Sequence, residues 1–443
     1  MPRDAAPSRR SSAWSSDRFA KPLARLGPWW GAILVALLVL ASAPFAVAPV
    51  RDAVTLVSVA EATLRRPLGY VLMSPVSEVL DLLALLSLRQ HVALLLTLLL
   101  GYVLWFAWRG RVTPVTVPPA RRGVRIAARI GLAILAVLAV YAAGVFLPRP
   151  MAALDTAAEV IAVDFHSHTK FSHDGRPDWT PEAVRDWHRD AGFTAAYVTD
   201  HRTFEGARDA WANNPEFTGQ GTPLLPGIEV VWKGEHVIVL DADRKYRGIF
   251  TETLRDIDEP ALAMASAIPG NEPVLIETFP GDITRMIAAG GPGTAGVRAI
   301  ELVDGAPKGL GQTRRERVRI VHYADSLNLA LVAGSNHHGW GHTASGWTLL
   351  YVPGWRNATP DQLSDAIVNI IRRGGVHSTR VVERYVADTE SGVQLVLTAP
   401  LVAWGMLRTL SPDERAVWVA WAVALTLVAR LLAWRRPRRD GAP

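Results

Sequence analysis

The sequence contains no cysteine among its 443 residues. Disulfide bonds and metal sites with thiolate ligands are therefore excluded, and the redox compartment is left undetermined. Ionisable residues are also nearly absent from the middle of the long apolar runs, apart from Glu78 and Asp81 in one marginal run. Because a transport path normally needs polar groups inside the membrane, this scarcity argues against a transporter and favours helices that only anchor the chain.

Long apolar runs lie on both sides of a more polar stretch. Residues 30–49, 91–108 and 128–147 precede it, and residues 416–434 follow it. Each run is about long enough to cross a hydrocarbon core of roughly 30 Å as a helix. Residues 393–407 form a shorter run that contains a proline, so the count is four or five. Several of the 16 tryptophans lie near the ends of these runs, where aromatic rings favour the headgroup region.

The charge distribution indicates how these helices are oriented. The net charge is +6, and basic residues gather in the N-terminal tail, in residues 109–129 and in residues 435–439. Such clusters mark cytoplasmic ends of spans, so four spans place both tails in the cytoplasm and the soluble part outside it. If residues 70–88 also span, the soluble part faces the cytoplasm instead. Orientation accounts for the basic excess, and no nucleic-acid partner is expected.

These patterns divide the chain into four parts. They are a basic cytoplasmic tail (1–28), an N-terminal membrane region of about three helices (29–150), a soluble domain (155–390), and a C-terminal membrane region of one or two helices with a basic tail (391–443). The predicted location is a membrane, with a multi-pass chain, and the inner membrane if the source is bacterial.

The soluble part alternates short β-branched runs with helical patterns. The expected strands are residues 160–165, 195–199, 223–231, 236–241, 274–279, 298–303 and 329–334. One helical pattern begins at Thr180 and Pro181, which match an N-cap and a first helical position. Repeated strands and helices over roughly 240 residues predict an α/β fold built on a parallel barrel.

Residues that can bind metals stand at the ends of these strands. His166 and His168 follow the first strand two residues apart, so on an extended segment they project to the same side. The later strands supply Asp200 and His201, then Glu229, then His236, and finally the sequence GSNHH. Ten of the 12 histidines lie between residues 166 and 342. A barrel builds its site at the carboxyl ends of its strands, so these residues predict a metal site.

The motifs HSHT and HDG, with the other ligand types in order after them, resemble those of the polymerase and histidinol phosphatase (PHP) family of metal-dependent phosphoesterases. The resemblance covers about residues 160–340 and continues in part to residue 390. It implies a distorted (β/α)7 barrel, flanked here by transmembrane helices. It also implies two or three divalent ions, of zinc, manganese or iron, at the carboxyl ends of the strands.

The resemblance also assigns the ligands. The first ion would take His166 and His168, Glu229 would bridge it to a second ion that takes His236, and a third ion would take Asp174, His201 and His338. Two positions depart from the family pattern. Phe279 stands where a histidine is usual, so the second ion loses a ligand, unless Glu277 or His337 compensates. Asn336 replaces a carboxylate, so it can give the first ion only a neutral amide oxygen.

This ligand set predicts hydrolysis of a phosphate ester by metal-activated water. Three residues are candidates for catalytic roles. Glu229 bridges ions, and Asp200, like Asp164, is placed to accept a hydrogen bond that fixes the ring of a ligand histidine. His337, like His173 and His342, is a candidate to bind the substrate or protonate a leaving group.

Two functions remain open. In one, the chain is a membrane-anchored phosphoesterase that acts on a phosphorylated small molecule, a lipid headgroup or a nucleotide. In the other, it is a catalytically impaired metal-binding or sensory module, as Phe279 and Asn336 indicate. The expected partners are a phosphorylated substrate and membrane lipid. The sequence indicates neither the substrate nor the oligomeric state.

Overall fold

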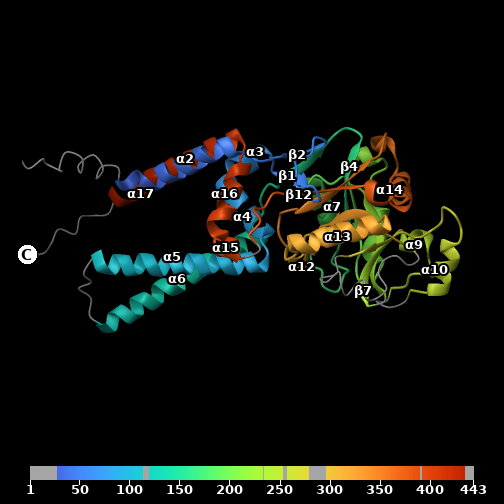
Figure 1. Cartoon of the computed structure of the whole chain (residues 1–443), viewed down its shortest axis with the longest axis horizontal. Helices are drawn as coiled ribbons and strands as arrows, with labels where there is room; N and C mark the ends of the chain where they lie inside the picture. Colours follow the sequence, from blue (N-terminus) through green and yellow to red (C-terminus); the bar gives the residue numbers. More distant parts are fainter. Residues whose placement is uncertain are drawn as a thin grey trace, which may run out of the picture. The chain divides into compact units, whose positions relative to one another are not determined.

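The computed structural model describes residues 27–112, 119–232, 234–252, 257–278, 296–389 and 392–434. The chain divides into two compact units (Figure 1). The first joins the N-terminal part up to Phe45 with the part from Ser411 onward, and the second runs from Ala46 to Leu410.

The first unit is a pair of apolar helices. A short turn, η1 (Gly27–Trp29), leads into α2 (Trp30–Ser42), which continues as η2 (Ala43–Phe45). Helix α17 (Pro412–Trp434) packs along α2. Arg415 donates hydrogen bonds to the Val39 carbonyl and the Ser42 hydroxyl, which satisfies the last polar groups of α2.

The second unit contains two long apolar helices, α5 (Leu88–Val112) and α6 (Pro119–Phe146). They meet where the Nδ1 atom of His91 lies 2.7 Å from the Tyr141 hydroxyl, and they diverge from there (Figure 1). Within the described residues, Leu88–Trp108, Ile126–Phe146 and Pro412–Trp434 are long and apolar enough to cross a membrane, whereas Trp30–Phe45 is shorter. The predicted run at residues 393–407 forms two short helices, α15 (Gly392–Val396) and α16 (Thr398–Thr409).

The rest of the second unit is built around a ten-stranded sheet in the order β1-β12-β11-β4-β5-β6-β7-β8-β9-β10. Its strands are β1 (Val50–Asp52), β4 (Val160–Ser167), β5 (Ala195–Val198), β6 (Leu224–Trp232), β7 (Glu235–Leu240), β8 (Leu275–Glu277), β9 (Val297–Asp304), β10 (Ala330–Gly334), β11 (Gly346–Tyr351) and β12 (Arg380–Arg384). Strands β4 to β10 confirm all seven predicted strands. A separate ribbon pairs β2 (Ala62–Arg65) with β3 (Ala153–Thr156).

The sheet curls until its seventh predicted strand meets its first. Beyond β10, the Asn336 amide donates to the His166 carbonyl, and the His168 amide donates to the His337 carbonyl. These bonds close β4 to β10 into a ring at one end, while β11 pairs with the other half of β4. The two ends of the predicted metal-binding sequence are thereby hydrogen-bonded to each other.

The predicted parallel barrel is only partly correct. β4–β5–β6 and β8–β9–β10 pair in parallel, but β7 runs antiparallel to both β6 and β8. Only two residues separate the end of β6 at Trp232 from the start of β7 at Glu235, too few for a parallel crossover, which needs a dozen or more. The ring is therefore a mixed α/β sheet and not a strict (β/α)7 barrel.

Both faces of the sheet are buried, as expected for central strands covered by helices. Along β4, Ile161, Val163 and Phe165 join one apolar cluster, while Ala162 belongs to another. Helix α14 (Pro360–Gly374) adds its buried apolar face to the first cluster, and α13 (Arg314–Leu327) packs on β9 and β10. Helix α7 (Pro181–Asp190) begins as predicted, because the Thr180 hydroxyl accepts from the Ala183 amide.

Residues 70–88 form two short helices, α3 (Leu68–Leu72) and α4 (Ser74–Leu85), with their carboxylates buried in ion pairs. Asp81 accepts from the Tyr70 hydroxyl at 2.8 Å and from the Arg149 guanidinium at 2.7 Å. Arg384 of β12 contacts both Asp81 and Glu78, and Arg66 pairs with Glu78. Burial alone would raise the pKa of Asp81, but Arg384 and Arg149 hold it below its usual value.

We expect Asp81→Ala to destabilise the second unit strongly, because it leaves Arg149 and Arg384 buried without their shared carboxylate. The expected loss is about 3–5 kcal/mol of unfolding free energy, measured by denaturant titration of the full chain in detergent. Asp155→Ala is the matched control, since Asp155 pairs with Arg65 at a half-exposed site and its loss should cost about 1 kcal/mol or less. Equal effects would contradict the assignment of a buried ionic cluster.

Candidate metal centre

The predicted ligands meet at one end of the curled sheet. His166 lies near the end of β4, His168 follows that strand, and His201 follows β5. Glu229 lies on β6, and its backbone forms an isolated parallel β-bridge with the backbone of His201. His236 lies at the start of β7, and because β7 runs antiparallel, its beginning reaches the same end of the sheet.

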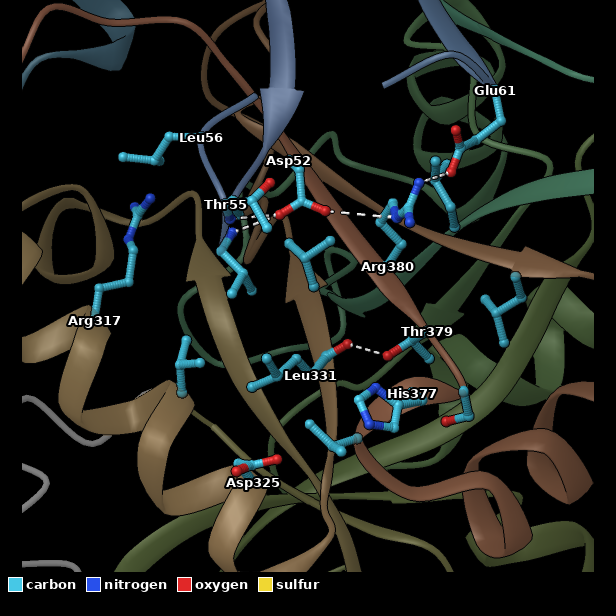
Figure 2. Close-up of a pocket in the computed structure, with 18 of the residues that line it drawn as sticks. Asp52, Thr55, Leu56, Glu61, Arg317, Asp325, Leu331, His377, Thr379 and Arg380 are labelled. Carbon is cyan, nitrogen blue, oxygen red and sulfur yellow. Dashed lines mark hydrogen bonds and ion pairs between the residues drawn. The ribbon is translucent and has the colours of Figure 1, made fainter. Parts of the chain in front are cut away.

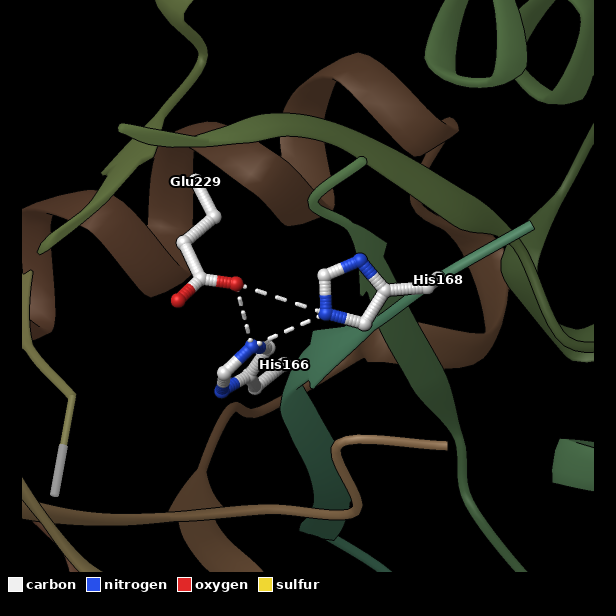
Figure 3. Close-up of side chains that lie close together, drawn as sticks. All are labelled: His166, His168 and Glu229. Carbon is white, nitrogen blue, oxygen red and sulfur yellow. Dashed lines mark hydrogen bonds and ion pairs between the residues drawn. The ribbon is translucent and has the colours of Figure 1, made fainter. Parts of the chain in front are cut away.

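Four histidine rings face the carboxylate of Glu229. The Nε2 atoms of His166, His201 and His168 lie 2.9, 3.3 and 3.4 Å from its Oε2 atom. The Nδ1 atom of His236 lies 2.7 Å from its Oε1 atom. Figure 3 shows His166, His168 and Glu229 pointing toward one another. Three of the rings therefore face one oxygen of this carboxylate, and the fourth faces the other oxygen.

A second group adjoins the first. The Oδ2 atom of Asp174 lies 3.2 Å from His338 Nε2 and 3.9 Å from His201 Nε2. The His338 ring stacks on His168, with the ring centres 4.2 Å apart. His168, Asp174 and His201 have ligand atoms close enough together for one ion. This side is open, because Asp174 is 41% exposed, whereas Glu229 is buried.

The electrostatics of the cluster couple its histidines to its carboxylates. Burial would raise the pKa of Glu229, but His166 beside it holds that pKa well below its usual value. Burial would lower the pKa of His166, yet the Glu229 and Glu301 carboxylates raise it well above its usual value. Burial lowers the pKa of His168 to about 3. His168 is therefore a neutral imidazole, the form that binds metals.

These residues fit divalent ions. The Nε2 atoms of His166 and His168 face each other at 3.1 Å, a separation that two nitrogen ligands of one divalent ion can have. The Nδ1 atoms of His168 and His201 are buried without a hydrogen-bond partner within the described part of the chain. Imidazole nitrogens and carboxylate oxygens are ligands of zinc, manganese and iron in proteins.

Glu301 is a member of the cluster that the sequence did not indicate. It lies on β9, is buried, and approaches His166 Nδ1 to 3.4 Å. Such a carboxylate orients a ligand ring and sets which nitrogen carries the proton. Its neighbour Asp304, at the end of β9, is also buried, which raises its pKa. The sequence ELVD at residues 301–304 could have indicated these two carboxylates, because they lie at the end of a predicted strand like the other ligand candidates.

Asn336 lies at the edge of the cluster in a left-handed conformation, with φ of 46°. Its side-chain amide donates to Asp304 at 3.4 Å. Its Oδ1 atom is buried and has no hydrogen-bond partner among the residues described. No hydrogen bond within the described residues competes for this oxygen, and its role as a neutral ligand stays a prediction. Phe279, the other departure from the family pattern, lies outside the described residues.

The neighbours His337 and His338 point in different directions. The His337 ring stacks on Trp187 with ring centres 4.2 Å apart, and it also contacts Trp179. Burial lowers its pKa to about 3. The His338 ring turns to Asp174 and His168 instead. This placement gives the predicted catalytic role of His337 no geometric support, and His338 stays a candidate ligand beside Asp174.

Asp200 and Asp164 contact other groups than the ligand rings expected of them. Asp200 accepts from both the amide and the hydroxyl of Thr169, each at 2.6 Å, and so fixes the turn after His168. Burial raises its pKa to about 6. Asp164 accepts from His188 Nε2 at 2.7 Å and from the His166 amide at 3.1 Å. Both carboxylates therefore hold the backbone that carries the ligands.

A cavity of about 800 Å³ lies elsewhere, against α13 and strands β10 to β12 (Figure 2). Two of its arginines are engaged in ion pairs: Arg380 contacts Asp52 and Glu61, and Arg317 contacts Glu383. None of the histidines around Glu229 lines it. The cavity is therefore separate from the cluster.

Several solved structures are distantly similar to this chain. No family model matches the sequence, and no curated protein matches it. The PsfC structure from Pseudomonas syringae is 16% identical, with a TM-score of 0.35, over 62% of this chain and 99% of that one. A two-domain protein from Bacteroides vulgatus, containing a predicted PHP-like metal-dependent phosphoesterase, is 13% identical, with a TM-score of 0.32, over 51% and 66% of the chains.

A lesion-specific endonuclease from Pyrococcus furiosus is also similar. It is 13% identical, with a TM-score of 0.34, over 47% of this chain and 56% of that one. Likenesses at this level assign no role to any residue.

The two neighbouring histidines allow a matched test of the ligand set. His338→Phe should remove at least one equivalent of bound metal from the full chain, because it deletes a ring nitrogen beside Asp174. His337→Phe should keep the metal content of the parent, because phenylalanine can fill the space against Trp187. Metal per chain would be measured by plasma mass spectrometry after dialysis. A loss of metal in His337→Phe with none in His338→Phe would contradict this arrangement.

Proposed function

We propose that the chain is a membrane-anchored, metal-dependent phosphoesterase that hydrolyses a phosphate ester. The observation that carries the proposal is the convergence of four histidines on the two oxygens of Glu229. A buried carboxylate among several imidazoles is costly as a purely structural device, since burial of charged groups is rarely repaid in full. If the same side chains bind metal ions, each of them supplies a ligand atom.

The proposed ligand groups follow the geometry. His166 and His168 with Glu229 form one group, and His201 and His236 with Glu229 form another. His168, Asp174 and His201 form a third, with His338 beside Asp174. Asn336 offers an amide oxygen at the edge. Divalent ions held by these groups would activate water for attack at phosphorus and neutralise charge on the phosphoryl oxygens.

The remaining side chains position these groups and leave room for a substrate. Glu301 orients the His166 ring, while Asp200 holds the turn after His168 through Thr169. His236 and His173 are each 49% exposed, so a phosphate ester can approach from their side. His173 is half-exposed beside Asp174 and is the proposed group for substrate contact at this mouth.

The proposed anchor is the set of apolar helices. Leu88–Trp108, Ile126–Phe146 and Pro412–Trp434 have the length and composition to span, and the shorter Trp30–Phe45 is a fourth candidate. Residues 70–88 are broken into two helices with buried, ion-paired carboxylates, which supports the four-span count. With four spans, the basic segments place the catalytic part on the exocytoplasmic side.

A second candidate function is a metal-binding or sensory module without turnover. Asn336 favours it, because a neutral amide holds a divalent ion less tightly than a carboxylate would. Under this reading the chain binds ions at Glu229 but releases no phosphate.

Phosphatase assays on the full chain in detergent, with added Mn²⁺ or Zn²⁺, separate the two functions. The substrate panel would include phosphomonoesters, phosphodiesters and nucleotides. We expect turnover that falls about a hundredfold or more in His168→Ala, because the variant removes a ligand shared by two groups. His322→Ala, in an exposed part of α13, should retain the parental rate. Bound metal without turnover on the whole panel would contradict the proposal and favour the sensory module.

A further inference from the structure

The end of α6 contacts the loop that carries His338. Phe146 is the last residue of α6 and of the candidate span Ile126–Phe146. Its ring meets the Trp340 ring edge to face, with centres 5.9 Å apart and planes at 84°. Trp340 follows His338 by two residues, which is at most about 7 Å of extended chain. The metal centre therefore lies close to the point where a candidate membrane span ends.

A buried hydrogen-bond network also holds the segment after α6 against the loop that carries His338. Arg149, three residues beyond α6, donates to the Asp81 carboxylate at 2.7 Å and to the Thr343 hydroxyl at 3.0 Å. Thr343 also donates to Asp81 at 2.8 Å. Residues 338–343 are thus joined both to the last residue of the span and to the segment just after it. The site and the helix end are held together by packing, so their separation does not depend on a flexible linker.

The surface between the helix end and the open side of the cluster has the composition of a lipid headgroup contact. Phe146 is 63% exposed and Trp340 is 49% exposed. The guanidinium of Arg176 lies 5.6 Å from the centre of the Trp340 ring, and it donates to the Gly339 carbonyl. Arg176 follows Asp174, the half-exposed ligand candidate, by two residues. Tryptophan is enriched at headgroup depth, and a basic side chain beside it can meet a headgroup phosphate.

We propose that the substrate is a phosphate ester in the headgroup of a membrane lipid, presented by the leaflet that surrounds the end of α6. The inference rests on the proposed phosphoesterase function and names its substrate class. A headgroup phosphate lies at the level where Phe146 and Trp340 would sit, and the open side at Asp174 is beside them. A soluble ester shares the phosphate chemistry but gains nothing from this exposed aromatic surface.

The test uses the full chain, loaded with Mn²⁺ and reconstituted in phosphatidylcholine vesicles that carry phosphatidic acid and phosphatidylglycerol. Lipid products and released phosphate are measured by mass spectrometry and colorimetry. Glycerol 3-phosphate and bis(p-nitrophenyl) phosphate serve as soluble esters in parallel. We expect faster turnover of a vesicle lipid than of either soluble ester. Phe146→Ala should lower the ratio of lipid to soluble turnover by about three- to tenfold, the scale of one aromatic contact.

Two further variants sharpen the result. Trp340→Ala should lower the same ratio, because it removes the other half of the ring contact. Trp108→Ala is the matched control: it replaces an exposed tryptophan 20 residues from Leu88, so it lies about 30 Å along α5 from the end that meets α6. That variant should keep the parental ratio.

The outcomes separate the two proposals. Turnover of soluble esters with none of the vesicle lipids would overturn the lipid inference and leave the phosphoesterase function standing. An equal ratio in the parent and Phe146→Ala would also overturn it. Absence of turnover on every substrate by the metal-loaded chain would overturn the phosphoesterase function and the lipid inference with it.

Discussion

The buried carboxylate of Glu229 is the group on which the rest of the site depends. It is fixed by β6 and faces histidines from β4, from the segment after β5 and from β7, and His166 beside it holds its pKa well below the usual value in spite of its burial. The contact between Glu229 and His236 requires β7 to run antiparallel to β6, because only then does the beginning of β7 lie at the same end of the sheet as Glu229. The departure from a parallel barrel is thus part of the site.

A second buried carboxylate, Asp81, connects this end of the sheet to the apolar helices. It lies on α4 and gathers Arg149 from beyond α6, Arg384 from β12 and Thr343 from the loop after His338. Because Arg149 and Arg384 are buried, separating either guanidinium from Asp81 would cost a large free energy. The end of α6 is therefore joined to the folded domain by more than covalent linkage, and the loop that carries the ligand candidate His338 shares these contacts.

Local pattern was sufficient for the strands but not for their directions. All seven predicted strands are present because apolar β-branched runs can be buried on both faces of a sheet. The parallel barrel was overpredicted, although the short gap between β6 and β7 already indicated a hairpin. In the same way, the run at residues 70–88 is apolar enough to suggest a span, but Glu78 and Asp81 both have Arg384, about 300 residues away in the sequence, as an ion-pair partner. Hydropathy alone cannot register such partners.

The sequence by itself determined which residue types stand at the strand ends, and so the ligand candidates around Glu229. It could do so because strand ends and histidine spacing are local properties. Only the tertiary structure decided that His338 turns toward Asp174 while His337 packs on Trp187, and that Glu301 approaches His166. These outcomes depend on side chains more than 100 residues apart, whose contacts exist only once the sheet has closed.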